Sequence, residues 1–208
     1  AEITFFAAGS SIAKEWIPLV SKKTIVIDNS SYFRMKNDVP LVVPEVNSKD
    51  LNSHKNIIAN PNCSTIQMVL ALKPLHDKYK IRRVVVSTYQ AVSGAGKSAM
   101  DELVTQTKDY LNNKKIIPKN YTKQIAFNVI PHIDIFGDDG YTKEELKMTN
   151  ETKKILDKDI SVTATCVRVP VKTSHSESIN IEFENTYDLS NIKKLLNNAP
   201  GCKVVDEQ

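Results

Sequence analysis

The chain contains a cysteine turn, Asn60-Pro61-Asn62-Cys63-Ser64-Thr65, between an apolar run at residues 57–59 and a helix-like segment at residues 66–76. Pro interrupts a strand, and Ser and Thr are favoured where helices begin, so the pattern predicts a strand, a turn and a helix N-terminus. The unpaired N–H groups and positive dipole end of that helix would favour the thiolate of Cys63. A thiolate is the nucleophilic form, and the same N–H groups stabilise an oxyanion when a carbonyl is attacked. These residues alone leave a buried structural cysteine open as the alternative.

Three blocks of sequence resemble bacterial aspartate-semialdehyde dehydrogenase in order and separation, and the resemblance covers nearly the whole chain. The blocks are Asn60-Pro61-Asn62-Cys63-Ser64-Thr65-Ile66-Gln67, Val86-Ser87-Thr88-Tyr89-Gln90-Ala91-Val92-Ser93-Gly94-Ala95-Gly96, and Arg168-Val169-Pro170-Val171 with His175-Ser176-Glu177. The resemblance implies an oxidoreductase that uses NADP to convert L-aspartyl-4-phosphate to L-aspartate-4-semialdehyde, in lysine, threonine and methionine biosynthesis. It also implies a thioester intermediate on Cys63.

A related enzyme, N-acetyl-glutamyl-phosphate reductase, is the alternative. That enzyme usually has Gly where Asn62 stands, and a different sequence after the cysteine. The residues around Cys63 therefore favour the aspartyl substrate.

The resemblance implies a role for each of several polar and small residues. Cys63, His175 and Gln90 would be catalytic; Arg168 and Glu144 would bind the substrate; Arg34, Lys147 and Asn62 would bind phosphate; Gly9, Ser10, Ser93 and Gly94 would contact the cofactor. Each has a plainer interpretation when taken singly. In that interpretation Arg34 and His175 are surface residues. Gln90 is then an amide that hydrogen-bonds loop backbone, and Glu144 and Lys147 form an exposed ion pair on one helix face.

The order of elements predicts an α/β fold. Residues 2–8 and 24–28 are expected to be parallel strands, with a helix ending near residue 20 between them. Residues 39–47 are expected to be extended, and residues 98–112 to form a helix with Ser98 and Asp101 in capping positions. A capping box, Thr142 with Glu145, opens another helix. Residues 160–171 and 178–183 alternate as strands of a half-exposed sheet.

Two domains are expected: a partial NADP-binding domain at residues 1–62, and a catalytic and dimerisation domain at residues 63–208 with a mixed or antiparallel sheet. The glycine-rich dinucleotide fingerprint of the first βαβ unit does not occur. The family also continues beyond the last residue. We therefore expect segments of the family fold on both sides of this chain. It is then either the ordered part of a longer enzyme or an inert fragment that serves as an interaction or dimerisation unit.

Composition fits a globular protein with a sizeable core, since 41% of the 208 residues are hydrophobic and 25% are charged. The net charge of +4 is too small and too scattered to indicate nucleic-acid binding. The sequence has no membrane-length apolar run and no signal peptide, so a cytoplasmic protein is expected, without membrane partners. The resemblance implies a homodimer or homotetramer.

Three cysteines, Cys63, Cys166 and Cys202, form neither a close pair nor a metal-ligand spacing. An odd, scattered set indicates reduced thiols, with no disulfide framework and no bound metal. Cys166 lies in a strand-like run and is expected to be a small core residue.

Overall fold

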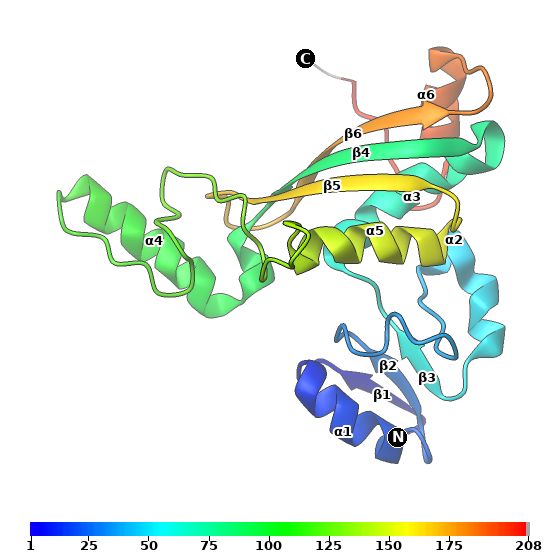
Figure 1. The fold of residues 1–208 in the computed structure, drawn as a ribbon, viewed down its shortest axis with the longest axis horizontal. Helices are drawn as coiled ribbons and strands as arrows, with labels where there is room; N and C mark the ends of the chain where they lie inside the picture. The colour runs from blue at the N-terminus through cyan, green and yellow to red at the C-terminus, as the bar shows by residue number, and fades with distance from the viewer. Residues whose placement is uncertain (207–208) are drawn as a thin grey trace. The chain divides into compact units, whose positions relative to one another are not determined.

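The computed structural model describes residues 1–206. Its helices and strands follow the order β1 (Ile3–Phe6), α1 (Ser10–Val20), β2 (Ile25–Asp28), α2 (Pro44–Asn47), β3 (Ile57–Ala59), α3 (Cys63–Tyr79), β4 (Ile81–Gln90), α4 (Lys97–Leu111), α5 (Lys143–Ile155), β5 (Ser161–Arg168), β6 (Ser176–Phe183) and α6 (Leu189–Asn198) (Figure 1). Short 3-10 turns cover Ser48–Ser53 and Val92–Ala95.

The chain divides into two compact units. The first comprises Ala1–Val84, Lys147–Val162 and the chain from Ile181 onward, and the second comprises Val85–Leu146 and Thr163–Asn180. Strands β4, β5 and β6 and helix α5 each pass from one unit to the other, so each unit is built from segments far apart in the sequence.

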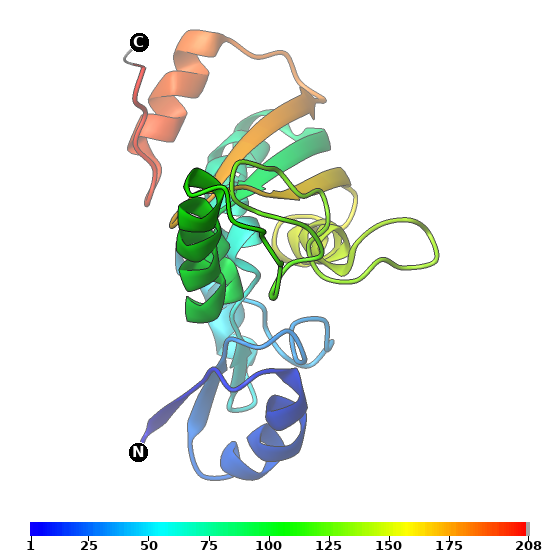
Figure 2. The same ribbon diagram turned by 90° about the vertical axis from the view of Figure 1, so that its left-hand side faces the viewer.

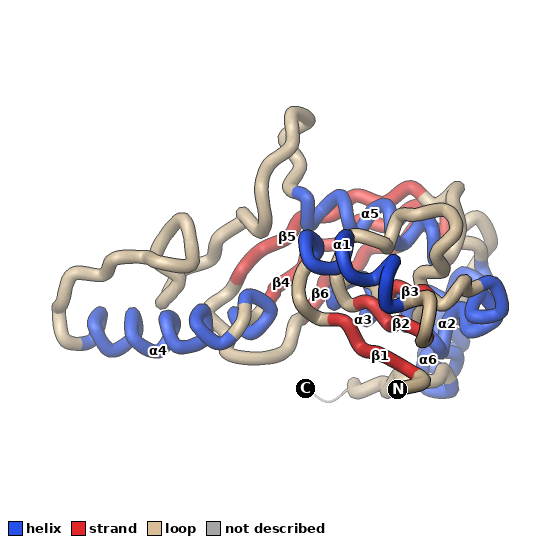
Figure 3. The backbone as a smooth tube through the Cα atoms, turned by 90° about the horizontal axis from the view of Figure 1, so that it is seen from below, coloured by secondary structure: helices blue, strands red, loops and turns tan. Residues whose placement is uncertain are grey.

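A parallel sheet with the order β1-β2-β3 lies in the first unit, and Figure 3 shows its strands side by side. Ile3 pairs with Ile25 at one end of the sheet, and Asp28 pairs with Ala59 at the other. Helix α1 connects the first two strands and lies beside them (Figure 2). The predicted parallel pairing of the first two strands is therefore confirmed.

The core of the first unit fills the space around this sheet. Its fully buried members come from helices and strands: Ala13, Ile17, Val26, Ala59 and Val69. Burial of these side chains provides the main stabilisation, at roughly 25 cal/mol per Å² of apolar surface removed from water. Because Val69 belongs to α3, the helix that begins at Cys63 is anchored to the parallel sheet.

A second sheet has the order β5-β4-β6, with β4 in the centre (Figure 1). Residues of β6 alternate regularly between exposed and partly buried, which is the predicted pattern of a half-exposed strand. The α/β fold class, with a parallel sheet and a second sheet, is therefore confirmed.

The second unit has its own small core of Val92, Leu103, Ile125, Ala126 and Ile130. Two buried polar side chains of α4 hold the long connection that follows it. Glu102 accepts hydrogen bonds from the backbone N–H groups of Lys119 and Asn120, both at 2.7 Å. Gln106 Oε1 accepts from the N–H groups of Ile125 and Ala126, at 2.8 and 3.1 Å. Backbone groups in this connection are thus satisfied by α4 side chains.

Two local predictions are wrong. Residues 44–47 are helical rather than extended, because Pro44 occupies the first helical position, where its fixed φ angle and missing N–H are favourable. Helix α4 begins at Lys97 with Gly96 at the N-cap, so Ser98 and Asp101 lie inside the helix. Gly96 has φ 92°, a conformation that glycine adopts most readily, and it replaces a side-chain cap there.

The predicted capping box at α5 is confirmed. Glu145 Oε2 accepts from the N–H of Thr142 at 2.7 Å, and Thr142 Oγ1 accepts from the N–H of Glu145 at 3.3 Å.

In the described part of the chain, no helix combines the length and apolar character needed to cross a membrane.

Candidate active site

The cysteine turn forms the N-terminus of α3, as predicted. Asn62 is the N-cap residue, and its Oδ1 accepts from the N–H groups of Ser64 at 3.0 Å and Thr65 at 3.2 Å. Cys63 is the first residue of the helix and is exposed. The alternative of a buried structural cysteine is therefore wrong. An exposed thiol in the first helical turn lies at the positive end of the helix dipole.

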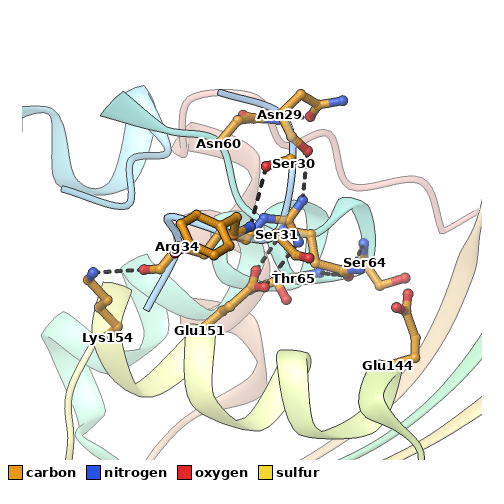
Figure 4. Close-up of polar contacts among 12 residues, drawn as sticks. Asn29, Ser30, Ser31, Arg34, Asn60, Ser64, Thr65, Glu144, Glu151 and Lys154 are labelled. Carbon is orange, nitrogen blue, oxygen red and sulfur yellow. Dashed lines mark hydrogen bonds and ion pairs between the residues drawn. The ribbon is translucent and has the colours of Figure 1, made fainter. Parts of the chain in front are cut away.

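Arg34 lies in the loop that follows β2 and is buried, with 8% of its surface exposed. Its Nη1 donates to Glu151 Oε1 at 3.1 Å, and its Nη2 donates to the carbonyl of Asn29 at 3.1 Å (Figure 4). The buried Nε has no hydrogen-bond acceptor among residues 1–206. The plainer interpretation of Arg34 as a surface arginine is wrong. A buried guanidinium that keeps an unused N–H donor is suited to an anionic ligand.

Glu151 is a residue that the sequence analysis missed. It lies on α5 with 1% of its surface exposed, and its Oε2 accepts from the backbone N–H of Asn62 at 2.6 Å. One carboxylate therefore joins Arg34 to the residue that precedes Cys63. Glu151 stands seven residues after Glu144, on the same helix face, and this spacing was the available sequence signal.

Lys154, also on α5, holds the backbone of the Arg34 loop. Its Nζ donates to the carbonyls of Arg34 and Lys36 at 2.7 Å and of Val39 at 2.9 Å. Burial lowers the pKa of Lys154, because desolvation disfavours its charged form. This contact was also missed, since a lysine near a helix C-terminus is usually solvent-facing.

In the second unit, a chain of side-chain hydrogen bonds runs from β4 to α5. Thr88 Oγ1 donates to Gln90 Oε1 at 3.1 Å, and Gln90 Nε2 donates to Glu144 Oε1 at 3.0 Å. Gln90 and Glu144 are both buried, with 1% and 6% of their surfaces exposed. The structure thus brings together Gln90, expected to be catalytic, and Glu144, expected to bind the substrate, and Glu144 is not a solvent-facing residue.

Arg168 and His175 share the backbone of Ala91. Arg168 Nη1 donates to the Ala91 carbonyl at 2.7 Å, and His175 Nδ1 accepts from the Ala91 N–H at 3.0 Å. A neutral imidazole whose Nδ1 accepts a hydrogen bond carries its proton on Nε2. Burial, followed by the charge of Arg168, lowers the pKa of His175, while the Ser174 backbone and the charge of Glu144 oppose the shift.

Gly94 provides room for these two side chains. A Cβ at this position would lie 3.2 Å from Arg168 Nη1 and 3.4 Å from His175 Nε2. The resemblance implied that Gly94 and Ser93 contact the cofactor. In the structure, Gly94 lies against Arg168 and His175, the residues expected to bind substrate and to transfer protons. Ser93 lies in the adjoining 3-10 turn, Val92–Ala95.

The other predicted cofactor turn, Gly9 with Ser10, follows β1 at the carboxyl end of the parallel sheet. Gly9 is the N-cap of α1 with φ 86°, and space for an added Cβ there is open. Ser10 Oγ lies 3.0 Å from Ser31 Oγ, which belongs to the loop after β2. Ligands bind at this edge of open parallel sheets.

Lys147, which is expected to bind phosphate, lies on α5, three residues after Glu144.

The other two thiols lie in different surroundings. Cys166 is buried in β5, and burial raises its pKa to about 12, while burial also raises the pKa of Cys202. Within the described part of the chain, the cysteines form no disulfide, and no group of three or more His, Cys, Asp or Glu side chains is arranged to hold a metal ion.

Comparison with known proteins agrees with this architecture. The fold is that of an α/β protein with a Rossmann-like parallel sheet. Residues 72–208 match the family model for the semialdehyde dehydrogenase dimerisation domain, and residues 1–54 match the semialdehyde dehydrogenase NAD binding domain. The chain therefore belongs to the semialdehyde dehydrogenase family.

Individual relatives are similar over nearly the whole chain. An aspartate-semialdehyde dehydrogenase from Aquifex aeolicus is 56% identical over 99% of this chain and 62% of its own length. Aspartate semialdehyde dehydrogenase II from Vibrio cholerae, solved in complex with ASA, is 47% identical with a TM-score of 0.95, over 97% of this chain and 61% of that one. The enzyme from Candida albicans, solved with NADP, is 28% identical with a TM-score of 0.72, over 95% and 55%. The chain thus spans 62% of the length of the Aquifex aeolicus relative.

Proposed function

We propose that this chain carries the nucleophile, the acid–base group and the substrate-binding residues of an aspartate-semialdehyde dehydrogenase. Such an enzyme converts L-aspartyl-4-phosphate to L-aspartate-4-semialdehyde and phosphate, in lysine, threonine and methionine biosynthesis. The observation that carries the proposal is the exposed Cys63 at the capped N-terminus of α3. The 56% identity to an enzyme of that name supports the same substrate.

Cys63 is the proposed nucleophile. Its thiolate attacks the acyl carbon of aspartyl phosphate, a carbon–sulfur bond forms, and the carbon–oxygen bond to phosphate breaks. The positive end of the α3 dipole favours the thiolate and the oxyanion of the attack. When the thioester is reduced, its carbon–sulfur bond breaks and the thiolate is regenerated.

Three residues are proposed to hold phosphate: Arg34, Lys147 and Asn62. The best support concerns Arg34, whose buried Nε has no acceptor among the described residues while Nη1 and Nη2 are anchored. A planar guanidinium fixed in this way offers a preorganised donor for a phosphate oxygen.

The proposed substrate-binding residues are Arg168 and Glu144, and Gln90 is proposed as a catalytic residue. Arg168 binds the substrate carboxylate, with Nη1 anchored on the Ala91 carbonyl. Glu144 binds the amino group, and its Oε1 is oriented by Gln90. Gln90 holds the reacting acyl group near Cys63.

His175 is the proposed acid and base. With Nδ1 accepting from the Ala91 N–H, the Nε2–H of the neutral ring is a donor that stabilises the oxyanion of the reduced thioester through a hydrogen bond. To act as base toward the Cys63 thiol or the hydroxyl of the hemithioacetal, the neutral ring carries its one proton on Nδ1 instead, which releases the Ala91 hydrogen bond, and Nε2 then takes the proton.

The proposed cofactor is NADP, which supplies or accepts the hydride when bound. Gly9, Ser10, Ser93 and Gly94 are proposed to contact it. The open space around Gly9, at the start of α1 and at the carboxyl edge of the parallel sheet, fits a nucleotide that approaches the backbone closely. A relative solved with NADP supports this phosphorylated cofactor.

We also propose a cytoplasmic homodimer or homotetramer, with a partial NADP-binding domain at residues 1–62 and a catalytic and dimerisation domain at residues 63–208. The description of the matched family model supports assembly. Exposed apolar side chains of the second unit, such as Leu111 at 70% and Phe127 at 60%, support it as well.

The test is phosphate-dependent oxidation of L-aspartate semialdehyde by the purified protein, followed as NADPH formation, with the acetylglutamyl aldehyde as the competing substrate. We expect turnover of the aspartyl aldehyde that requires phosphate and NADP. Preference for the acetylglutamyl aldehyde would favour the related reductase instead. A folded protein inert with both would indicate an interaction unit.

A further inference from the structure

Glu151 joins two segments of the first unit through one buried carboxylate. Its Oε1 accepts from Arg34 Nη1 at 3.1 Å (Figure 4). Its Oε2 accepts from the backbone N–H of Asn62 at 2.6 Å. The three residues come from α5, the loop after β2 and the cysteine turn. Each oxygen of the carboxylate thus holds a different segment.

Burial makes this arrangement specific. Glu151 is 1% exposed and Arg34 is 8% exposed, so neither charge is solvated by bulk water. A buried carboxylate is tolerated only where opposite charge and hydrogen bonds replace its hydration. The ionised Glu151 carboxylate therefore requires both donors. Displacement of either donor shifts the carboxylate and so changes the position of the other donor.

The same helix also fixes the backbone of Arg34. Lys154 stands three residues after Glu151, and its Nζ donates to the Arg34 carbonyl at 2.7 Å. The side chain and the backbone of Arg34 are thus both held by α5. Asn62 in turn caps α3 through its side chain while its own N–H is held by Glu151.

We propose that Glu151 is a positioning residue, which aligns the anion-binding guanidinium of Arg34 with the turn that presents Cys63. This inference rests on the proposed function, because it assumes that phosphate binds Arg34 and that Cys63 is acylated. Glu151 itself touches no reacting atom in this account.

Two substitutions separate the geometry of Glu151 from its charge. Glu151→Gln keeps one acceptor oxygen, but its NH₂ group then faces either the Arg34 guanidinium or the Asn62 N–H, both of which are donors. Glu151→Asp keeps the charge and both acceptors, but it is one methylene shorter and cannot span the two partners. If bridging is the role, both variants are defective.

Glu102→Gln is the matched control. Glu102 is also a buried carboxylate, at 8% exposed, that accepts two backbone N–H bonds, and it lies outside the proposed site. Glu151→Gln and Glu102→Gln therefore both lose the stability that comes from a buried carboxylate. Only Glu151→Gln changes the proposed site.

The experiment measures two properties in the full chain. The first is the rate of Cys63 alkylation by iodoacetamide at pH 7, which needs no substrate or cofactor. The second is the KM for phosphate in aldehyde oxidation. We expect Glu151→Gln and Glu151→Asp each to change both by about tenfold, since small misplacements of reacting groups have effects of this size. Glu102→Gln should change neither.

The Arg34 link has a further test. If Glu151 acts on phosphate through Arg34, adding Glu151→Gln to Arg34→Ala should raise the phosphate KM by less than about threefold over Arg34→Ala alone. Additive effects would contradict that link.

The proposal is overturned if folded Glu151→Gln protein keeps the wild-type alkylation rate and phosphate KM within about twofold. Lack of phosphate-dependent turnover in the wild type would instead overturn the proposed function. The alkylation comparison would still decide the link to the cysteine turn, because a wild-type rate in both Glu151 variants would refute it. A Glu151 variant with a lower melting temperature but an unchanged alkylation rate and phosphate KM has only a structural defect, and this result also refutes the proposal.

Discussion

Gln90 Nε2 donates to Glu144 Oε1 at 3.0 Å, which joins the end of β4 to the first turn of α5 within the second unit. Both side chains are buried, and Thr88 holds the other end of the Gln90 amide. The amide therefore has one orientation, with its oxygen toward Thr88 and its NH₂ group toward Glu144. A carboxylate oriented in this way is suited to a substrate ammonium group.

Gln90→Ala should lower kcat/KM for the aspartyl aldehyde by about 100-fold, because both the contact with the acyl group and the orientation of Glu144 are lost. Thr88→Val removes the donor to Gln90 Oε1 but keeps the Gln90 side chain, so we expect a loss of roughly three- to tenfold. Steady-state kinetics of the two variants provide the check. Equal losses, or no loss in Gln90→Ala, would contradict this order.

The cap of α3 gives a prediction about stability. Asn62→Ala removes the acceptor for the Ser64 and Thr65 N–H groups and should cost about 1 kcal/mol of unfolding free energy. Asn62→Asp keeps that acceptor and should be within a few tenths of the wild type. Urea unfolding measures both. The idea of a side-chain cap fails if the Ala and Asp variants are equally stable.

Gly94 gives a prediction about crowding. A Cβ at Gly94 would lie 3.2 Å from Arg168 Nη1, tighter than ordinary contact, so Gly94→Ala should displace the guanidinium by a few tenths of an ångström. We expect a several-fold higher KM for the aldehyde. Gly137→Ala, crowded only by the exposed Asp139, is the control. Unchanged kinetics in Gly94→Ala would show that Arg168 does not need this space.

His175 gives a prediction about pH. Burial and the charge of Arg168 lower its pKa below the ordinary 6.5, so the folded protein binds this proton less readily than the unfolded chain. Its contribution to stability is therefore present above about pH 6.5 and is lost as the pH falls through the lower folded value. Protonation places a proton on Nδ1 against the Ala91 N–H, so kcat/KM should fall over the same acidic window.

Arg168→Met removes a charge that lowers the pKa of His175, and should move the acid limb of the pH–rate profile upward. Arg168→Lys keeps the charge and should leave the limb in place, although both variants raise the KM for substrate. Identical acid limbs in wild type and Arg168→Met would argue against electrostatic coupling of the two residues.

Local sequence patterns predicted the parts of the fold that local physics determines. The parallel strands β1 and β2 were visible as runs of β-branched and aromatic residues. The start of α3 followed from the Pro turn with Ser64 and Thr65. The capping box of Thr142 and Glu145 was visible for the same reason, since both partners lie within one helical turn.

Long-range partners were not visible in the sequence. Glu151 and Asn62 are 89 residues apart, and Lys154 is 120 residues from Arg34. The seven-residue spacing from Glu144 places Glu151 on the same helix face, but nothing local indicates the partners of Glu151 or Lys154, because tertiary packing alone brings them together. The resemblance drew attention to Arg34 and Glu144, but their anchoring contacts required the structure.

The central claim is that Cys63 forms a thioester with the aspartyl group. The direct measurement is to mix the protein with L-aspartate semialdehyde and NADP without phosphate, quench it in acid, and map the modified peptide by mass spectrometry. We expect an aspartyl group on the Cys63 peptide that disappears when phosphate is added. Cys166 serves as an internal control, because burial raises its pKa to about 12 and leaves almost no thiolate near neutral pH. Turnover without any modification of Cys63, or full turnover by Cys63→Ser, would contradict the covalent mechanism.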